Sequence, residues 1–89
     1  MMLERTVRIA NKNGLHARPA AEIVKLAAKF KSEITILKDD LDVNGKSIMG
    51  VMMLAAEHGS NVTFRAEGPD AQQALDELEK LVSNKFGES

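Results

Sequence analysis

The sequence predicts an α+β fold in which helices cover one face of a β-sheet and the other face meets solvent. Segments in which apolar and polar residues alternate are interspersed with segments whose apolar residues recur every three or four positions, in the order β-α-β-β-α-β-α. The segments predicted as strands are apolar on one side only, which is typical of a sheet covered on a single face.

The chain is short, and its composition is that of a soluble globular protein. Its 89 residues predict one domain, 1–89, with one core. A formal net charge of −1, with three Phe and neither Tyr nor Trp, argues against a nucleic-acid-binding protein. There is no cysteine, no recognisable signal peptide and no apolar run long enough to span a bilayer, so we expect a cytoplasmic protein without stable membrane association.

The first strand and the first helix follow from two different periodicities. Over residues 3–9 every second residue faces one mostly apolar side, which predicts a strand. Over about 17–30 an apolar stripe predicts a helix. The stripe consists of Ala20, Ile23, Val24, Ala27 and Phe30. Asn13-Gly14 forms the preceding turn, and Pro19 fits the first helical turn, where a missing N–H is no loss. His16 therefore lies at or beside the N-cap of this helix.

A hairpin is predicted next. Residues 33–38 alternate and are rich in β-branched side chains, which predicts a second strand. Asp39-Asp40 predicts a turn, and Leu41 with Val43 predicts a short third strand. Because the turn is tight, we expect the two strands to pair with each other.

A short, strongly apolar helix is predicted over about 48–55. Ser47 is a good N-cap, and His58-Gly59-Ser60 are expected to end the helix. Apolar residues lie almost all around its circumference, so only some of them can face the sheet.

The last strand and the last helix are predicted over residues 62–66 and about 71–84. The strand alternates, and the helix has the clearest apolar stripe in the chain. Asp70 is the expected N-cap, with Gln73 placed as in a capping box. Residues 85–89 are expected to fray.

Chemically, the segment around His16 combines a nucleophile, a cation and a helix start. The first amides of a helix lack internal partners and carry partial positive charge, so those of Ala17 and Arg18 can bind an anion. The Arg18 guanidinium is suited to phosphate oxygens. A neutral imidazole is a competent nucleophile, so His16 could carry a phosphoryl group. The alternative is that His16 is an ordinary capping residue and Arg18 a solvated surface charge.

Segment 13–20, Asn-Gly-Leu-His-Ala-Arg-Pro-Ala, resembles the active-site segment of the HPr family, the histidine-containing phosphocarriers of the bacterial phosphoenolpyruvate-dependent phosphotransferase system. Segment 45–52, Gly-Lys-Ser-Ile-Met-Gly-Val-Met, resembles the second signature of that family. The two motifs stand in the order and spacing of the family. The resemblance implies an open-faced β-sandwich, with a four-stranded antiparallel sheet and three helices on one face.

The resemblance also assigns residues to roles. It implies that His16 is phosphorylated and that the Arg18 guanidinium and the amides of Ala17 and Arg18 hold the phosphoryl group. Ser47 corresponds to the serine that a dedicated kinase/phosphatase modifies in many bacteria. Lys12 and Lys46 are either further positive charges around the site or solvated surface lysines.

The helix at 48–55 is implied to be the docking surface. By analogy with the family, Val51 and Leu54 face the core, and Met53 is left open between core and surface. The remaining apolar residues form an exposed patch that binds Enzyme I and the enzyme IIA proteins. They are Ile48, Met49 and Met52. Unbranched Met side chains suit a surface that accepts several partners.

The resulting prediction is a monomeric phosphocarrier rather than an enzyme. It accepts a phosphoryl group on His16 from Enzyme I and passes it to enzyme IIA, without a cofactor. Two alternatives stay open: a carrier of the nitrogen-related branch, and a regulatory HPr-like protein that acts through Ser47. The known regulatory variant lacks the active histidine, so the presence of His16 counts against the second alternative. Some family members place the C-terminus near the active site, so a role for Glu88 also stays open.

A calcium-binding scaffold is a third alternative. Asp40, Asp42 and Asn44 match the first positions of an EF-hand loop. The twelfth position is Val51, where a bidentate Glu is needed, and the preceding segment reads as a strand instead of a helix. We therefore expect no metal site, and nothing in the spacing of the two histidines suggests one.

Overall fold

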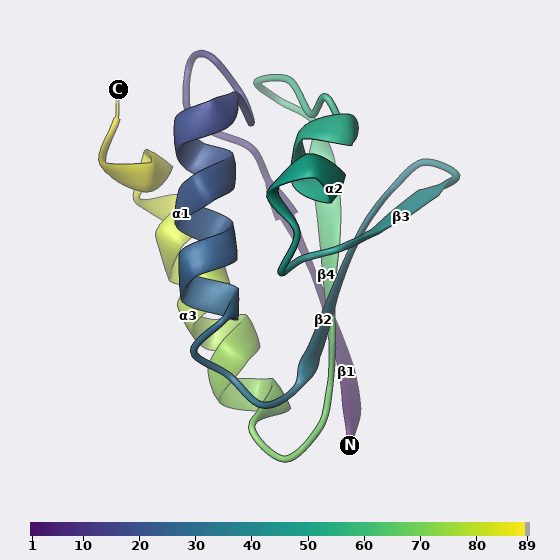
Figure 1. Cartoon of the computed structure of the whole chain (residues 1–89). Helices are drawn as coiled ribbons and strands as arrows, with labels where there is room; N and C mark the ends of the chain where they lie inside the picture. Colours follow the sequence, from purple (N-terminus) through teal and green to yellow (C-terminus); the bar gives the residue numbers. More distant parts are fainter. Residues whose placement is uncertain (89) are drawn as a thin grey trace.

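The computed structural model describes residues 1–88 and consists of one four-stranded sheet with helices packed on it (Figure 1). The strands are β1 (Met2–Arg8), β2 (Glu33–Lys38), β3 (Leu41–Asn44) and β4 (Asn61–Glu67). The helices are α1 (Ala17–Ala27), α2 (Ile48–Met53), α3 (Ala71–Ser83) and the 3₁₀ turn η1 (Lys85–Gly87). The strands stand in the order β1-β4-β2-β3, and every neighbouring pair is antiparallel. The expected open-faced β-sandwich is thereby confirmed.

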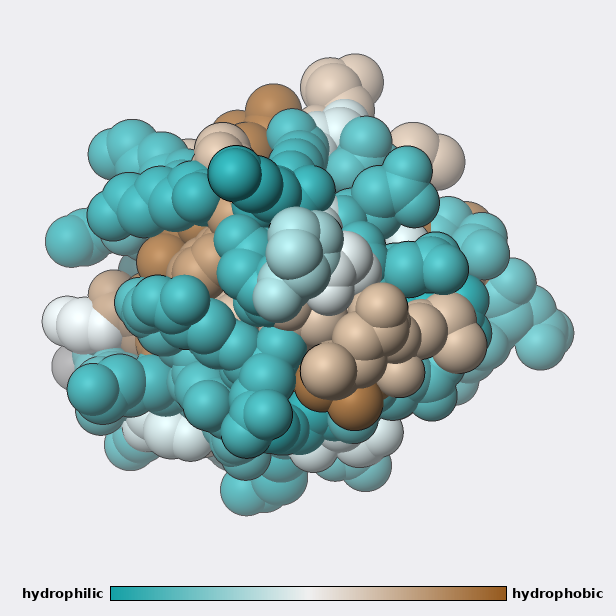
Figure 2. Space-filling view, turned by 90° about the horizontal axis from the view of Figure 1, so that it is seen from below, coloured by the Kyte–Doolittle hydropathy of each residue, from teal (hydrophilic) through white to brown (hydrophobic). Residues whose placement is uncertain are grey.

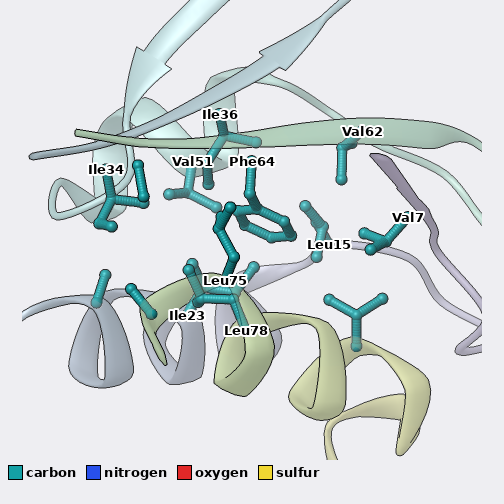
Figure 3. Close-up of a cluster of buried hydrophobic side chains, with 14 of the residues drawn as sticks. Val7, Leu15, Ile23, Ile34, Ile36, Val51, Val62, Phe64, Leu75 and Leu78 are labelled. Carbon is teal, nitrogen blue, oxygen red and sulfur yellow. The ribbon is translucent and has the colours of Figure 1, made fainter. Parts of the chain in front are cut away.

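The three α-helices lie on one side of the sheet, and the core fills the space between (Figure 3). Every second residue of β1 and β4 turns toward the helices, as the alternation predicts. Phe64 at the centre of β4 is 1% exposed and packs among side chains from all layers. Hydrophobic burial on this one face holds the elements together. None of the helices in residues 1–88 has the length and apolarity needed to cross a membrane.

Two helices end earlier than predicted. α1 ends at Ala27, because the N–H groups of Lys29 and Phe30 donate to carbonyls three residues back in a tight final turn. α2 ends at Met53, and the stop is Ala55, which adopts φ +47°, and not His58-Gly59-Ser60. The chain therefore turns back toward α1 directly after α2.

The capping box predicted at the start of α3 is wrong. Asp70 is the N-cap, but its carboxylate accepts hydrogen bonds from the N–H of Lys31 (2.9 Å), the N–H of Ser32 (2.9 Å) and the Ser32 hydroxyl (2.6 Å). Gln73 donates to Glu77 instead. Asp70 thus joins the α1–β2 loop to the β4–α3 loop. This joint lies at the end of the molecule where β1 begins, which Figure 2 shows from below as a mostly hydrophilic surface with separate hydrophobic areas.

Residues 85–88 were expected to fray, but Lys85–Gly87 form a 3₁₀ turn that is held against the core. Phe86 is 6% exposed and belongs to the hydrophobic core, and Lys85 and Phe86 both adopt positive φ angles. Burial of one aromatic side chain outweighs the freedom of a chain end. Glu88, two residues after Phe86, is held near the start of α1 by its contact with His16. Ser89 lies outside the described residues.

Candidate functional site

The loop before α1 is fixed on the α2–β4 loop by backbone contacts. The N–H of Leu15 donates to the carbonyl of Ala56 at 2.8 Å. Gly14 adopts φ +67°, and a Cβ at this position would lie only 2.5 Å from the same carbonyl oxygen. Asn11 is fully buried and donates through Nδ2 to the carbonyl of Gly14 at 2.7 Å. The position of the next residue, His16, is therefore determined by contacts on both sides of the loop.

His16 is the N-cap of α1, as predicted. Its carbonyl accepts the first helical hydrogen bond, from the N–H of Ala20 at 3.0 Å, and its ring makes no capping bond. The amides of Ala17 and Arg18 precede this first helical donor, so the helix provides no carbonyl for them. The His16 side chain is 41% exposed. An exposed imidazole thus stands over the positive end of a helix dipole, where an anion is stabilised.

The Glu88 side chain holds the His16 ring from the C-terminal segment. Nε2 of His16 lies 3.3 Å from Oε1 and 3.2 Å from Oε2 of Glu88, and Asn11 Nδ2 donates to Oε1 at 3.1 Å. An ionised carboxylate only accepts hydrogen bonds, so this contact requires a proton on Nε2. In the neutral ring Nδ1 then has the free lone pair.

Glu88 is only 15% exposed, and its surroundings favour the ionised form. Partial desolvation raises the pKa of the carboxyl group, but hydrogen bonds from His16 and Asn11 and the nearby charges of His16 and Arg18 outweigh it, so the pKa lies below its ordinary value. Neither Glu88 as a partner of the ring nor Asn11 as the buried donor could be identified from periodicity or motif spacing. Glu88 contacts both His16 and Asn11 across more than seventy positions of the chain.

Two shallow pockets flank the His16 ring. One is lined by Lys12, Asn13 and the turn 55–58 after α2, and the other by Lys12, Asn13, Arg18 and Glu88. Lys12 therefore lies at the site, in agreement with the alternative that it adds positive charge there. Lys46 does not, because its Nζ donates at 2.7 Å to the carbonyl of Phe30, beyond the far end of α1. The residues that line the two pockets carry positive charge on Lys12 and Arg18 and negative charge on Glu57 and Glu88.

The predicted patch on α2 is exposed. Val51 and Leu54 face the core with exposed fractions of 0% and 4%, and the other apolar residues of the helix remain at the surface. They are Ile48 (41%), Met49 (73%), Met52 (43%) and Met53 (66%). Met53 thus belongs to the surface. We refer to these four residues as the α2 patch.

Ser47 is the N-cap of α2, as predicted, and its Oγ accepts a hydrogen bond from the N–H of Gly50 at 3.2 Å. It stands at the opposite end of α2 from Ala55, which lines a pocket beside His16. The α2 patch therefore lies between Ser47 and the His16 site.

The segment that resembles an EF-hand loop does not form one in the structure. Asp42 and Asn44 belong to β3, where they pair with Leu37 and Thr35 of β2, so the chain is extended where an EF-hand loop must curl around an ion. Within residues 1–88 no three His, Cys, Asp or Glu side chains are grouped closely enough to bind a metal. The side chain of Asn44 accepts a hydrogen bond from the N–H of Lys46 at 2.8 Å and serves the turn.

A family model, similar sequences and solved structures all relate this chain to the same family. The family model described as "PTS HPr component phosphorylation site" matches residues 3–84. The phosphocarrier protein HPr of Cupriavidus necator is 51% identical over 87 residues, which are 98% of each chain. The HPr-like protein Crh of Halalkalibacterium halodurans is 51% identical over 84 residues, which are 94% of this chain and 100% of that protein. A crystal structure of HPr-C-His from Thermoanaerobacter tengcongensis superposes with a TM-score of 0.94 at 49% identity and covers 98% of both chains.

Proposed function

The chain belongs to the HPr family of phosphocarrier proteins, and from this membership we propose that it takes a phosphoryl group on His16 from phosphorylated Enzyme I and passes it to enzyme IIA proteins of the phosphotransferase system. The observation that carries the proposal is the arrangement of the His16 ring. It stands exposed at the N-terminus of α1, with Glu88 on Nε2 and Arg18 two residues further along. No cofactor takes part.

The geometry supports transfer through Nδ1. With the proton on Nε2 facing Glu88, the Nδ1 lone pair attacks phosphorus, a P–N bond forms, and the bond from phosphorus to Enzyme I breaks. The positive charge that develops on the ring is stabilised by the Glu88 carboxylate. The phosphoryl oxygens meet the free amides at the start of α1 and the Arg18 guanidinium. In the second transfer the group leaves Nδ1 for an enzyme IIA histidine, and the chain returns to its starting state.

The α2 patch is the proposed docking surface for both partners. It reaches from Ser47 to the turn 55–58 that borders the His16 pocket, so a partner seated on the patch can reach the ring. Exposed apolar area of this kind marks an interaction site, and flexible Met side chains can fit two different partners. The ring and the patch lie on the same chain, which supports the proposal that the carrier works as a monomer. We also propose that it works in the cytoplasm, together with its partners.

Ser47 is the proposed regulatory site, used by a kinase/phosphatase where the organism has one. A phosphate at this N-cap is tolerated by the end of α2, because free amides and the helix dipole favour negative charge there. Its added charge lies beside Ile48 and Met49 and weakens docking of a partner with acidic contacts. The fold would stay intact, since Ser47 contributes no side chain to the core.

The test is incubation with phosphoenolpyruvate and purified Enzyme I, followed by phosphorus NMR and intact mass. We expect one acid-labile phosphate in the natural chain and none in His16→Ala. Arg18→Ala should accept the group roughly tenfold more slowly, the effect of one charge-assisted hydrogen bond in an exposed site.

His58→Ala is the matched control, because His58 is the other histidine of the chain and lines the pocket beside His16. It should keep the phosphate. A phosphate retained in His16→Ala, or lost in a folded His58→Ala, would contradict the assignment. Phosphorylation by the Enzyme I of the nitrogen branch in preference to that of the sugar branch would place the carrier there, and phosphate on Ser47 alone would favour the regulatory protein.

A further inference from the structure

The side chains that oxidants attack most readily are few in this chain and are all at its surface. There is no cysteine, tryptophan or tyrosine, so the five methionine thioethers are the first targets of two-electron oxidants. Their exposed fractions range from 43% to 76%, and none belongs to the hydrophobic core. Peroxide can therefore reach every one of them in the folded protein.

Three of the five methionines lie on the six-residue helix α2. Met49, Met52 and Met53 are spaced three and four residues apart and share its outer face. The other two are Met1 and Met2, at the opposite end of the molecule from the turn that follows α2 (Figure 1). Most of the oxidisable sulfur of the chain is thus concentrated on the α2 patch.

The inner face of α2 is independent of these sulfurs. Val51 and Leu54 anchor the helix in the core with exposed fractions of 0% and 4%, and Ser47 caps it. Adding an oxygen to an exposed thioether neither buries a polar group in the core nor removes one of these contacts. The chemistry of the patch can therefore change while the fold persists.

We propose that Met49, Met52 and Met53 form an oxidant-sensitive switch, in which their conversion to methionine sulfoxide reversibly weakens docking of Enzyme I. This inference rests on the proposed function, since it takes the α2 patch as the docking surface. The oxidant is hydrogen peroxide or a similar two-electron peroxide. A sulfur lone pair attacks one peroxide oxygen, an S–O bond forms and the O–O bond breaks. The second oxygen leaves as hydroxide and takes the proton of the oxygen now bound to sulfur, so the products are the sulfoxide and water. Sulfur loses two electrons and the peroxide gains them.

The sulfoxide changes docking through polarity and not through charge. It replaces an apolar surface by a strong hydrogen-bond acceptor, and a partner that covers it must desolvate an oxygen that has no donor in an interface made for thioethers. One such unpaired group raises the KM for the carrier by about tenfold. A phosphate on Ser47 acts on the same patch through charge, so raising the salt concentration should relieve the effect of phosphorylation and leave the effect of oxidation.

The experiment compares each protein with its own unoxidised form. The purified chain is treated with hydrogen peroxide, the peroxide is removed with catalase, and peptide mass spectrometry counts the oxygens on each methionine. Enzyme I and phosphoenolpyruvate are then added, and the initial rate of phosphorylation is measured against carrier concentration. We expect sulfoxide on α2 to raise KM about tenfold with little change in kcat. Circular dichroism should show an unchanged fold, and methionine sulfoxide reductases with a thiol reductant should restore KM.

Two variants separate the α2 patch from the rest of the chain. Peroxide treatment should not change the KM or kcat of the triple variant Met49→Leu/Met52→Leu/Met53→Leu from the values of its unoxidised form. In Met2→Leu it should raise KM as much as in the natural chain. An unchanged KM in chains with oxidised α2 would overturn the proposal, as would an equal response of the triple variant. Failure of the proposed function would look different, because unoxidised chain would then take no phosphoryl group from Enzyme I.

Discussion

Gly14→Ala is expected to destabilise the protein because this residue lies against another loop. With φ +67°, Gly14 occupies the left-handed region, which an L-residue enters at a cost of about 1–2 kcal/mol. An added Cβ would stand 2.5 Å from the carbonyl oxygen of Ala56 and 3.0 Å from the Cα of Glu57. Both neighbours are backbone atoms, so the two loops must move apart.

The separation removes the hydrogen bond from the N–H of Leu15 to Ala56, which contributes about 0.5–1.5 kcal/mol net. Together with the backbone strain, the free energy of unfolding should fall by about 2–3 kcal/mol, a large share of the total of about 5–15 kcal/mol for a small domain. Transfer should slow as well, since His16 lies two residues further along and depends on the same loop.

Gly59→Ala is the matched control. Gly59 also has a positive φ, +90°, but the nearest atom to its added Cβ is the flexible Nη2 of Arg8 at 3.8 Å. This variant should lose only the strain, about 1–2 kcal/mol. Urea unfolding followed by circular dichroism measures both losses, and the Enzyme I assay measures the transfer rate. If Gly14→Ala proves no more destabilising than Gly59→Ala, crowding against Ala56 is not what requires glycine at this position.

Two further predictions concern carboxylates that the tertiary structure has placed. The hydrogen bonds from the Ser32 hydroxyl and the Lys31 N–H lower the pKa of Asp70 to about 2. This folded pKa lies below the unfolded value of about 3.9, so the ionised carboxylate stabilises the fold. The stabilisation is complete above about pH 3.9 and is lost as the pH falls toward 2. The difference in unfolding free energy between the natural chain and Asp70→Asn should therefore be largest above pH 4 and shrink in acid, and a difference independent of pH would contradict this role. Glu88→Gln should slow phosphorylation of His16 by about tenfold, because the ring loses the carboxylate that stabilises its developing positive charge. The ¹⁵N shifts of the ring should show a smaller share of the tautomer protonated on Nε2. An unchanged rate and an unchanged tautomer would remove Glu88 from the site.

The start of α1 illustrates what local sequence can predict. His16 was expected at the N-cap from Pro19 and the apolar stripe that follows, and it is the N-cap. Ser47 was expected to cap α2, and Gly50 donates to it. Caps and amphipathic faces depend on residues within one or two turns, so their evidence stands in the sequence itself.

The strand order was not available from periodicity. Alternation reports that one face of a strand is buried, but not which strand lies beside it. The tight turn predicted the β2–β3 hairpin, which the structure confirms, whereas the rest of the antiparallel sheet was expected only from the resemblance to the HPr family. Similarly, Asp70 had two competing sets of donors, its own helix and the loop at Lys31 and Ser32. The Asp70 carboxylate binds the loop and not its own helix, because the fold brings two N–H groups and a hydroxyl of the loop to it together.

By itself the sequence determined the succession of strands and helices, the helix start at His16 and, through two motifs, the family. Only the tertiary structure decided that Lys46 binds the carbonyl of Phe30, away from the site. It also decided that Glu88 reaches the His16 ring and accepts a hydrogen bond from Asn11. Phe86 shows the physical reason: its burial in a core built by every other element carries the end of the chain to the start of α1. Contacts of this kind join residues far apart in sequence, and their energy exists only once the whole fold has formed.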